Sequence, residues 1–230
     1  MSIESEIFLK YTPDFKKLID YGFAKKSKVY TIEKFFLDGF RAVIKVYDDG
    51  KIKGIVYDTE NGDEYLPLRL ENQEGSFVGK VRETYSTTLE EIRDKCFIKN
   101  YFASNQGNRI SDLICKKYGD KPIFMWEEYP TLGVFKNPES DKWYGLMMYI
   151  PWAKLDVKRE GWIEVINIKL DKEEIIELLK KDGFYPAWHM NKKSWITLIL
   201  DETLSDKKIM EYIEESHSYT VKKKKISRKV

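Results

Sequence analysis

The sequence predicts an α+β fold made of two small domains, on three observations. Short β-branched and aromatic runs are separated by Asp-Gly and Asn-Gly pairs, which tolerate the positive φ of tight hairpin turns. Amphipathic helical segments flank these runs. A polar stretch, IKNYFASNQGN, divides the chain, and we place the boundary at residues 98–104. The expected domains are residues 1–100 and 101–221, followed by a basic tail, residues 222–230, that we expect to be flexible.

The N-terminal domain is expected to be an antiparallel β-meander with flanking helices. Its first helix has Thr12 as a suitable N-cap and Pro13 at the first helical position. Apolar residues then follow at helical spacing, at Phe15, Leu18 and Ile19. The pattern predicts a short amphipathic helix that packs on the meander.

Four strands are predicted next, with the sequences KVYTIEKFF, FRAVIKVY, KIKGIVYD and EYLPLRL. Turns at Asp38-Gly39, Asp49-Gly50 and Asn61-Gly62 separate them. Apolar residues occupy both alternating sets of FRAVIKVY, so this strand is expected to be buried on both faces. A long helix, about Ser76 to Phe97, completes the domain. Its apolar residues recur every three or four positions, at Phe77, Val81, Tyr85, Leu89, Ile92 and Cys96.

The C-terminal domain is expected to be an antiparallel sheet with helices packed on one face. It opens with the helix NRISDLICKKYG and continues with four predicted strands, PIFMWEEYP, LGVFKNP, KWYGLMMYIPW and WIEVINIKL. Asp171 and Glu174 form a capping pattern at the start of a second helix, which should bury Ile175, Ile176 and Leu179. A last strand, SWITLILD, and a closing helix, SDKKIMEYIEESH, end the domain.

Composition argues against a membrane protein and against a secreted one. Hydrophobic residues make up 42% and aromatic residues 14% of the chain, and no apolar run reaches the roughly 18–20 residues of a membrane span. The start, MSIESEIFLKYTPDF, lacks the basic and apolar regions of a signal peptide, so we expect a cytoplasmic protein. Cys96 and Cys115 lie in helical patterns and are expected to be buried. With only His189 and His217 besides, no zinc spacing exists, and we expect neither metal nor cofactor.

Charge is unevenly distributed along the chain. The net charge is +2, and the tail VKKKKISRKV carries six positive charges, among them Lys222, Lys223, Lys224 and Lys225. With these six subtracted from +2, the rest of the chain carries −4. Two interpretations of the tail remain open: a solvated end that aids solubility, or a basic arm that binds nucleic acid.

The segment GFYPAWHMNKKSW, residues 183–195, places two tryptophans, a tyrosine, a histidine, an asparagine and two adjacent lysines within thirteen residues. A catalytic role for His189 would require a nucleophile or an orienting acid, and no motif supplies one, so we expect a protein that is not an enzyme. We expect the His189 ring to bond a backbone carbonyl and fix the loop. Asn191 suits a turn, and Trp195, which leads an apolar strand, suits a core position.

Lys192 and Lys193 lie between Trp188 and Trp195. Cations beside aromatic rings are typical of a nucleic-acid surface, where phosphates contact lysine and bases contact rings. The same composition also suits a cation–π contact that merely fixes the loop, and both interpretations remain open. Three further residues join this surface if the strands converge on one face: Lys142, Trp143 and Lys169.

Three segments carry a resemblance to a known family: NIKLDKEE, YPAWHMNKKSWITLILD and LSDKKIMEYIEESHSY. Together with KKYGDKPIFMWEEYPTLGVFKNPESDKWYGLMMYIPWAKL upstream, they resemble the MmcQ/YjbR family over about residues 104–221. The resemblance implies a frataxin-like (CyaY-like) α+β fold, also described as a double wing similar to the DNA-binding domain of a phage transcription factor. Frataxin-like folds can carry an acidic iron-binding ridge, but here DKEEIIELLKKD mixes lysines with its acids.

DNA binding is the function that the resemblance implies, on the basis of the fold. We therefore expect a non-enzymatic protein that binds nucleic acid through a Lys/Trp surface and the basic tail. The expected contact residues outside the tail are Lys142, Trp143, Lys169, Trp188, His189, Asn191, Lys192, Lys193 and Trp195. The alternative is a protein-interaction or adaptor module, which the charge of −4 outside the tail favours.

Overall fold

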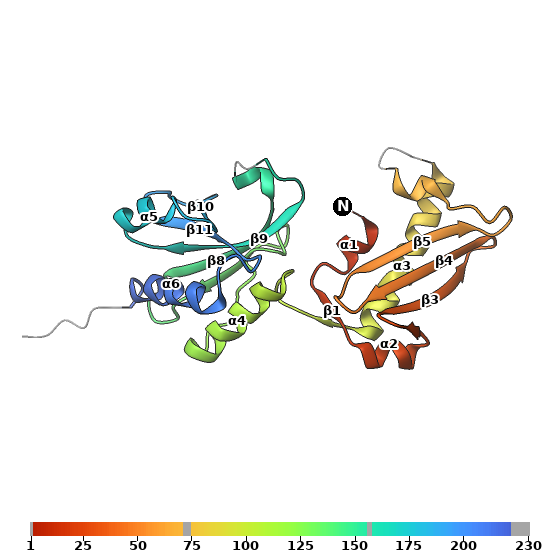
Figure 1. The fold of residues 1–230 in the computed structure, drawn as a ribbon, viewed down its shortest axis with the longest axis horizontal. Coiled ribbons are helices and arrows are strands. Elements are labelled where there is room, and N and C mark those ends of the chain that lie inside the picture. Colours follow the sequence, from red (N-terminus) through yellow and green to blue (C-terminus); the bar gives the residue numbers. More distant parts are fainter. Residues whose placement is uncertain (1, 71–74, 156–157, 222–230) are drawn as a thin grey trace, which may run out of the picture. The chain divides into compact units, whose positions relative to one another are not determined.

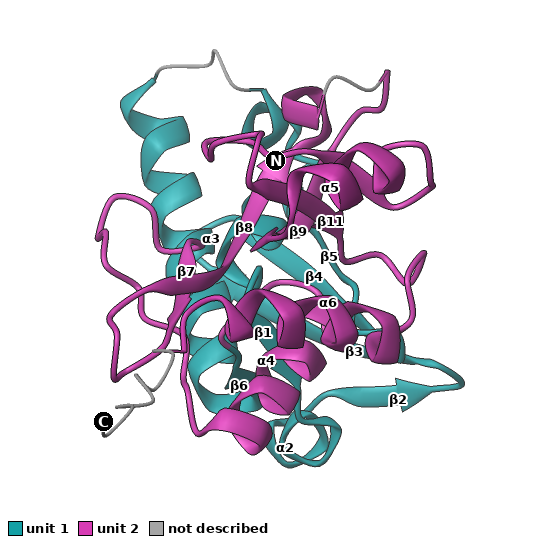
Figure 2. Cartoon of the chain, turned by 90° about the vertical axis from the view of Figure 1, so that its left-hand side faces the viewer, with its two compact units in different colours: residues 1–100 teal, residues 101–230 magenta. Residues whose placement is uncertain are grey.

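The computed structural model describes residues 2–70, 75–155 and 158–221 (Figure 1). The chain forms two compact units, residues 1–100 and residues 101–230 (Figure 2). Each unit has its own antiparallel sheet and its own hydrophobic core. No helix within the described ranges is long and apolar enough to cross a membrane.

The sheet of the first unit is an antiparallel meander, as predicted. Its strands follow the order β2-β3-β4-β5, with β2 at Ala24–Lys26, β3 at Val29–Phe36, β4 at Phe40–Tyr47 and β5 at Ile52–Asp58. The predicted turns at Asp38-Gly39 and Asp49-Gly50 are confirmed, with φ of 114° at Gly39 and 86° at Gly50. A residue with a side chain would be strained at these positive φ values, which glycine adopts readily.

Three helices and a second, small sheet complete the first unit. The helices are α1 (Ile3–Ile7), α2 (Phe15–Tyr21) and α3 (Ser76–Cys96), with a 3₁₀ turn at Leu66–Arg69. Strands β1 (Tyr11–Pro13) and β6 (Phe97–Lys99) pair with each other. The long helix α3 confirms most of the predicted seam: Val81, Tyr85, Leu89, Ile92 and Cys96 are all fully buried against one face of the sheet (Figure 1). The prediction is wrong at Phe77, which lies in the first turn of the helix and is 58% exposed.

Four further predictions for the first unit are wrong. The N-cap of α2 is Asp14, whose Oδ1 accepts from the amides of Lys16 and Lys17 at 3.1 Å, whereas Thr12 and Pro13, the predicted N-cap and first helical residue, lie in β1. EYLPLRL forms the 3₁₀ turn and not a strand, because Pro67 has no N–H to donate to a ladder. Strand β4 is buried on one face only. Ile19 is largely exposed, since a short helix turns only a narrow stripe inward.

A buried ion pair joins the start of the chain to the sheet and to α3. The carboxylate of Glu4 accepts two hydrogen bonds from Arg69 at 3.1 Å and one from the Tyr85 hydroxyl at 2.6 Å. Burial alone raises the pKa of Glu4, but the hydrogen bonds from Arg69 and Tyr85 outweigh it and hold this pKa below its ordinary value. The cluster leaves no room at Gly54, where a Cβ would lie 1.7 Å from the Tyr85 hydroxyl oxygen.

Strand β5 is one of the two edge strands of this sheet, and polar groups cover part of its free side. Arg69 Nη2 donates to the carbonyl of Gly54. The amide of Tyr65 donates to the carbonyl of Val56 at 2.8 Å, and the amide of Asp58 donates to the carbonyl of Asp63 at 3.0 Å. The backbone groups that point away from β4 therefore have partners at three successive outward positions.

The second unit contains a five-stranded antiparallel sheet in the order β10-β11-β9-β8-β7. Its strands are β7 (Gly133–Lys136), β8 (Trp143–Pro151), β9 (Trp162–Lys169), β10 (Phe184–Pro186) and β11 (Trp195–Ile199). Its helices are α4 (Asn105–Tyr118), α5 (Lys172–Leu178) and α6 (Asp206–Ser218), with a 3₁₀ turn, η2, at Trp152–Leu155.

The two faces of this sheet are covered differently. All three helices pack on one face, as predicted, and bury Ile110, Ile114, Ile175, Leu178, Ile209 and Ile213 there. We call the opposite side the second face. It is apolar, with Val134, Leu146, Met148, Ile150, Val165 and Ile199, and it is covered by η2 and by the chain between β10 and β11. The predicted α+β architecture is therefore confirmed.

Four local predictions for the second unit are wrong. PIFMWEEYP is not a strand: only Ile123 pairs, in an isolated bridge with Val134, and the chain then turns at Glu127-Glu128. Asp171 occupies the N-cap of α5 but makes no side-chain cap hydrogen bond. The helix buries Ile175 and Leu178, which lie three residues apart, and leaves Ile176 and Leu179 exposed. Cys96 is buried as expected, whereas Cys115 is only half-buried.

Replacing Glu4 by Gln should destabilise the first unit by about 2 kcal/mol, because Arg69 and Tyr85 lose a buried charged acceptor. The difference from the wild type should shrink as the pH falls below 4.5, since a carboxyl with a lowered pKa gives its stability above that value and loses it on protonation. Urea unfolding followed by far-UV circular dichroism measures this.

The control is Glu6→Gln, an exposed acid on the same helix, which should change stability little. All six tryptophans lie beyond residue 100, so the unfolding transition seen by tryptophan fluorescence should stay unchanged in both variants. Equal losses in the two variants would contradict a special role for Glu4.

Candidate functional site

The segment between β10 and β11 runs over the second face of the C-terminal sheet. We call residues 187–194 the Trp-Lys loop. Its Trp188 and Met190 pack against the apolar cluster of the second face, together with Tyr185 of β10. The apolar residues of the loop thus hold it on the sheet, while the polar residues between and after them turn toward solvent.

A buried polar network fixes the backbone of Trp188. Asn167 of β9 and Thr197 of β11 face each other across the strands, and both are fully buried. The Asn167 amide nitrogen donates to the Trp188 carbonyl at 2.8 Å, and the Thr197 hydroxyl donates to the Asn167 side-chain oxygen. The Trp188 amide donates to the Thr197 hydroxyl oxygen at 3.4 Å. Both backbone groups of Trp188 therefore have buried partners on the sheet.

His189 does not make the hydrogen bond expected from the sequence. Its side chain is exposed, its φ is 59°, and its ring centroid lies 3.7 Å from that of Trp188. Within the described residues its ring bonds no backbone carbonyl. The Asn167 and Thr197 side chains hold the loop instead, and the only sign of them in the sequence is a pair of polar residues inside otherwise apolar strands.

Asn191 forms the turn that the sequence predicts. Its side-chain oxygen accepts from the Lys193 amide at 3.0 Å, and its carbonyl accepts from the amides of Ser194 and Trp195 at 3.0 Å. Because this turn is compact, Lys192 and Lys193 lie exposed at its tip.

A hollow of about 400 Å³ lies between η2 and the Trp-Lys loop. Its lining includes Lys154, Trp188, His189 and Lys192, with Leu155, Pro186, Ala187 and Met190 as the remaining members. Lys154 Nζ lies 5.9 Å from the centroid of the Trp188 ring. No carboxylate lines this hollow among the described residues. Sequence reasoning missed Lys154, because η2 precedes the loop by some thirty residues and only the fold brings them together.

The strand register gathers three more of the predicted residues at one end of the second face. Lys169 of β9 lies directly opposite Trp195 of β11. Gly145 pairs with Ile168, so Trp143, at the start of β8, lies at this same end, where it packs against the second face. Lys142 precedes it and is exposed. Trp195 is only 9% exposed, so its ring is a core element, as its strand position predicts.

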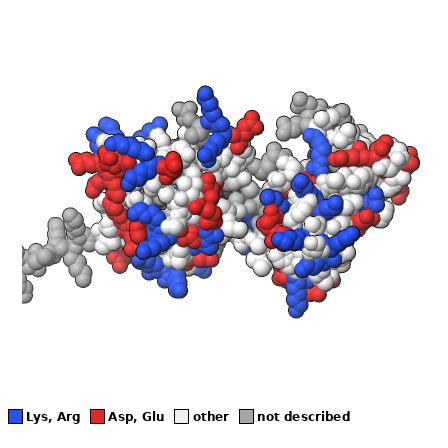
Figure 3. Space-filling view, in the orientation of Figure 1, with Lys and Arg blue, Asp and Glu red and all other residues white. Residues whose placement is uncertain are grey.

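No ion pair is found, within the residues that the structure describes, for Lys142, Lys154, Lys169, Lys192 or Lys193. Some other lysines of the unit are paired: Lys180 lies 2.7 Å from Glu177, and Lys136 pairs with Asp141. On the face of the molecule that Figure 3 shows, acidic and basic side chains are interspersed. The predicted tail contacts, Lys222 to Lys225, lie outside the described residues.

The described residues contain no group of three or more histidine, cysteine or acidic side chains able to hold a metal ion. The chemistry available at the Trp-Lys loop is therefore that of ammonium groups, an imidazole and indole rings. Such groups contact anions and planar rings.

Comparisons with known proteins match the second unit. The family model described as YjbR matches residues 116–219. An uncharacterised protein of Bacillus subtilis (strain 168), YyaQ, is 33% identical over 105 residues, which are 46% of this chain and 89% of that protein.

Two solved structures, both from Pseudomonas syringae, are also similar. A crystal structure is 40% identical, covers 51% of this chain and 100% of its own, and has a TM-score of 0.49. A solution NMR structure is 38% identical, covers 53% and 97%, and has a TM-score of 0.48.

Replacing Asn167 by Leu, which has a similar size, should destabilise the second unit by about 2 kcal/mol, because the Trp188 carbonyl and the Thr197 hydroxyl lose a buried partner. Faster amide hydrogen exchange in residues 187–194, together with a lower urea midpoint by tryptophan fluorescence, would show this destabilisation. Asn191→Ala, which removes only the exposed turn bond, should cost less than about 1 kcal/mol. An unchanged exchange rate in Asn167→Leu would contradict the anchoring role.

Proposed function

The chain belongs, through its C-terminal half, to the YjbR family, and we propose that in this member the Trp-Lys loop and the neighbouring strand ends bind nucleic acid. The observation that carries the proposal is the hollow beside the loop. It combines two ammonium groups, an imidazole and an indole ring, with no carboxylate in its described lining.

The lysines and the tryptophan of this surface would contact different parts of the nucleic acid. Ammonium groups of Lys154, Lys192 and Lys193 face solvent without a counter-ion among the described residues, so phosphate oxygens are suitable partners. The Trp188 ring is half-buried and fixed from behind, which leaves one part of it for contact with a base or sugar. Because such contacts do not reach base edges in a defined pattern, binding should depend weakly on sequence.

The anchored backbone supports this function energetically. A ring that is already fixed loses little conformational freedom when a ligand arrives, and this lowers the cost of binding. Lys142 and Lys169, at the end of the sheet, extend the cationic surface beyond the loop. No catalytic step is part of the proposal.

A protein-interaction role has its own supporting observation. The connector between α4 and β7 exposes Met125 (50%), Trp126 (37%) and Tyr129 (56%), which is unusual for large apolar side chains so near one another in sequence. Binding through this connector would be driven by apolar burial and would depend little on salt, so the salt titration below separates the two functions.

Replacing Lys192 and Lys193 together by Gln should weaken binding of a single-stranded oligonucleotide by about tenfold at low salt. It should also reduce the salt dependence of log Kd by about 1.4, since each phosphate contact on a single strand contributes about 0.7. Fluorescence anisotropy over a salt series, with a single-stranded and a duplex probe, measures both quantities.

The matched control is Lys172→Gln with Lys181→Gln, which removes the same charge from two exposed lysines at α5, on the helix-covered side. This pair should leave affinity close to that of the wild type. Absence of binding at low salt, a salt-independent Kd, or an equal loss in the control pair would each refute the proposal.

A further inference from the structure

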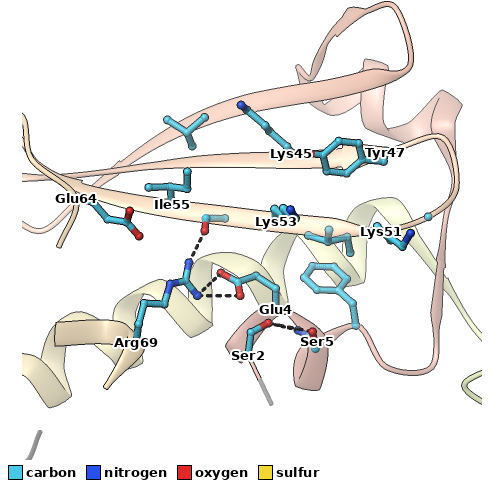
Figure 4. Close-up of a pocket in the computed structure, with 15 residues that line it drawn as sticks. Ser2, Glu4, Ser5, Lys45, Tyr47, Lys51, Lys53, Ile55, Glu64 and Arg69 are labelled. Carbon is cyan, nitrogen blue, oxygen red and sulfur yellow. Dashed lines mark hydrogen bonds and ion pairs between the residues drawn. The ribbon is translucent and has the colours of Figure 1, made fainter. Parts of the chain in front are cut away.

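The outer face of the N-terminal sheet carries a groove that the C-terminal site does not involve. Helix α3 covers only the inner face, so the alternate side chains of β4 and β5 remain partly open. A groove of about 920 Å³ runs along β4 and the edge strand β5 to α1 (Figure 4). This volume lies within the range of small-molecule sites.

Two lysines occupy directly opposite positions on the two strands that line the groove. The register pairs Lys45 of β4 directly with Lys53 of β5, on the same face. Like charges in directly opposite positions destabilise a sheet, so such a pair calls for a compensating anion. Neither ammonium group forms an ion pair within the part of the chain that the structure describes.

Two acidic side chains on the adjoining strand and turn are already engaged. Glu33, on the next strand of the same face, accepts from Arg41 at 3.2 and 3.3 Å. Asp49, in the hairpin turn, lies 2.9 Å from Lys51. The residue opposite Lys45 on its other side is Thr31, which is uncharged. The protein itself therefore supplies no counter-ion at the Lys45–Lys53 pair in the described residues.

The other charges of the groove lie away from this pair or cancel. Arg69 and Glu4 neutralise each other at the inner edge. Glu64 lies toward the Arg69 end of the groove, whereas Tyr47 and Lys51 lie toward the opposite end, with Lys45 and Lys53 between (Figure 4). The cationic part of the groove is thus next to Tyr47 and separate from Glu64.

Tyr47 supplies a planar surface beside the two lysines. It lies two residues after Lys45 on the same face of β4, lines the groove, and is half-buried. Within the described residues its ring packs against no other aromatic ring. Aromatic side chains on the open face of a sheet are suited to stacking with bases, while adjacent cations contact phosphate.

We propose that this groove binds a nucleotide, with its phosphate between Lys45 and Lys53 and its base against Tyr47. The site is on a different unit from the Trp-Lys loop, so it goes beyond the function proposed above and does not depend on it. A free nucleotide and a nucleotide unit of a single strand share this chemistry, and the experiment distinguishes them.

The test uses the full chain carrying Lys192→Gln and Lys193→Gln, in which binding at the Trp-Lys loop is weakened. Only the part of the affinity that a groove variant in this background loses is assigned to the groove. Calorimetric titrations with inorganic phosphate, adenosine monophosphate and a short oligothymidylate measure the three affinities. We expect the monophosphate to bind at least tenfold more tightly than phosphate. A further gain with the oligonucleotide that is lost when Lys45 and Lys53 are replaced indicates a strand as the ligand, and the absence of such a gain indicates a free nucleotide.

Adding Lys45→Gln with Lys53→Gln should weaken nucleotide binding at least tenfold. The variant should also have a higher Tm than its background in chloride buffer, because the like-charge pair is gone. We expect phosphate to raise the Tm of the background protein and to leave the Tm of the variant unchanged. Lys16→Gln with Lys80→Gln, two exposed helix lysines of the same unit, should change none of these. Tyr47→Leu should lower nucleotide affinity to that of phosphate.

Three results would overturn the proposal. One is equal nucleotide affinity in the Lys45/Lys53 variant and in its background. Another is an equal loss in the Lys16/Lys80 control. The third is an unchanged nucleotide preference in Tyr47→Leu, which would remove the ring from the site.

Discussion

The candidate site of the second unit depends on one buried side chain, Asn167. An amide in the middle of an apolar strand is costly unless all its groups are bonded, and here Trp188 and Thr197 supply the partners. This requirement couples two strands to the loop above them, so that the indole ring and the lysines that follow it have a defined place. Without the amide, apolar packing alone would hold the loop, and apolar contacts do not specify a single backbone position.

The architecture could be predicted from the sequence because periodicity and turn residues are local signals. The seam of α3 and the glycine turns at Gly39 and Gly50 needed no tertiary information. The errors arose where apolar composition was taken as sufficient for a strand: EYLPLRL and PIFMWEEYP are rich in such residues but contain or adjoin prolines and turns. The position of the long helix was easier to predict because it repeats its signal over several turns.

The candidate sites were predicted less completely, for a physical reason. Segment 183–195 was visible because its residues are adjacent in sequence, and the turn at Asn191 follows from its side chain. Lys154 contributes to the same hollow from a distant 3₁₀ turn, and the pairing of Lys45 with Lys53 requires the strand register. Proximity across strands is a property of the folded chain, so composition along the sequence gives little sign of it.

The polar cover along β5 has a consequence for behaviour at high concentration. A bare edge strand is a template on which another chain can add, and this is a common route to insoluble aggregates. Here a guanidinium group and a short return of the chain occupy the outward carbonyls of Gly54 and Val56. We therefore expect the arginine that neutralises a buried acid also to limit the addition of other chains at this edge, so that replacing it would affect aggregation as well as the stability of the single molecule.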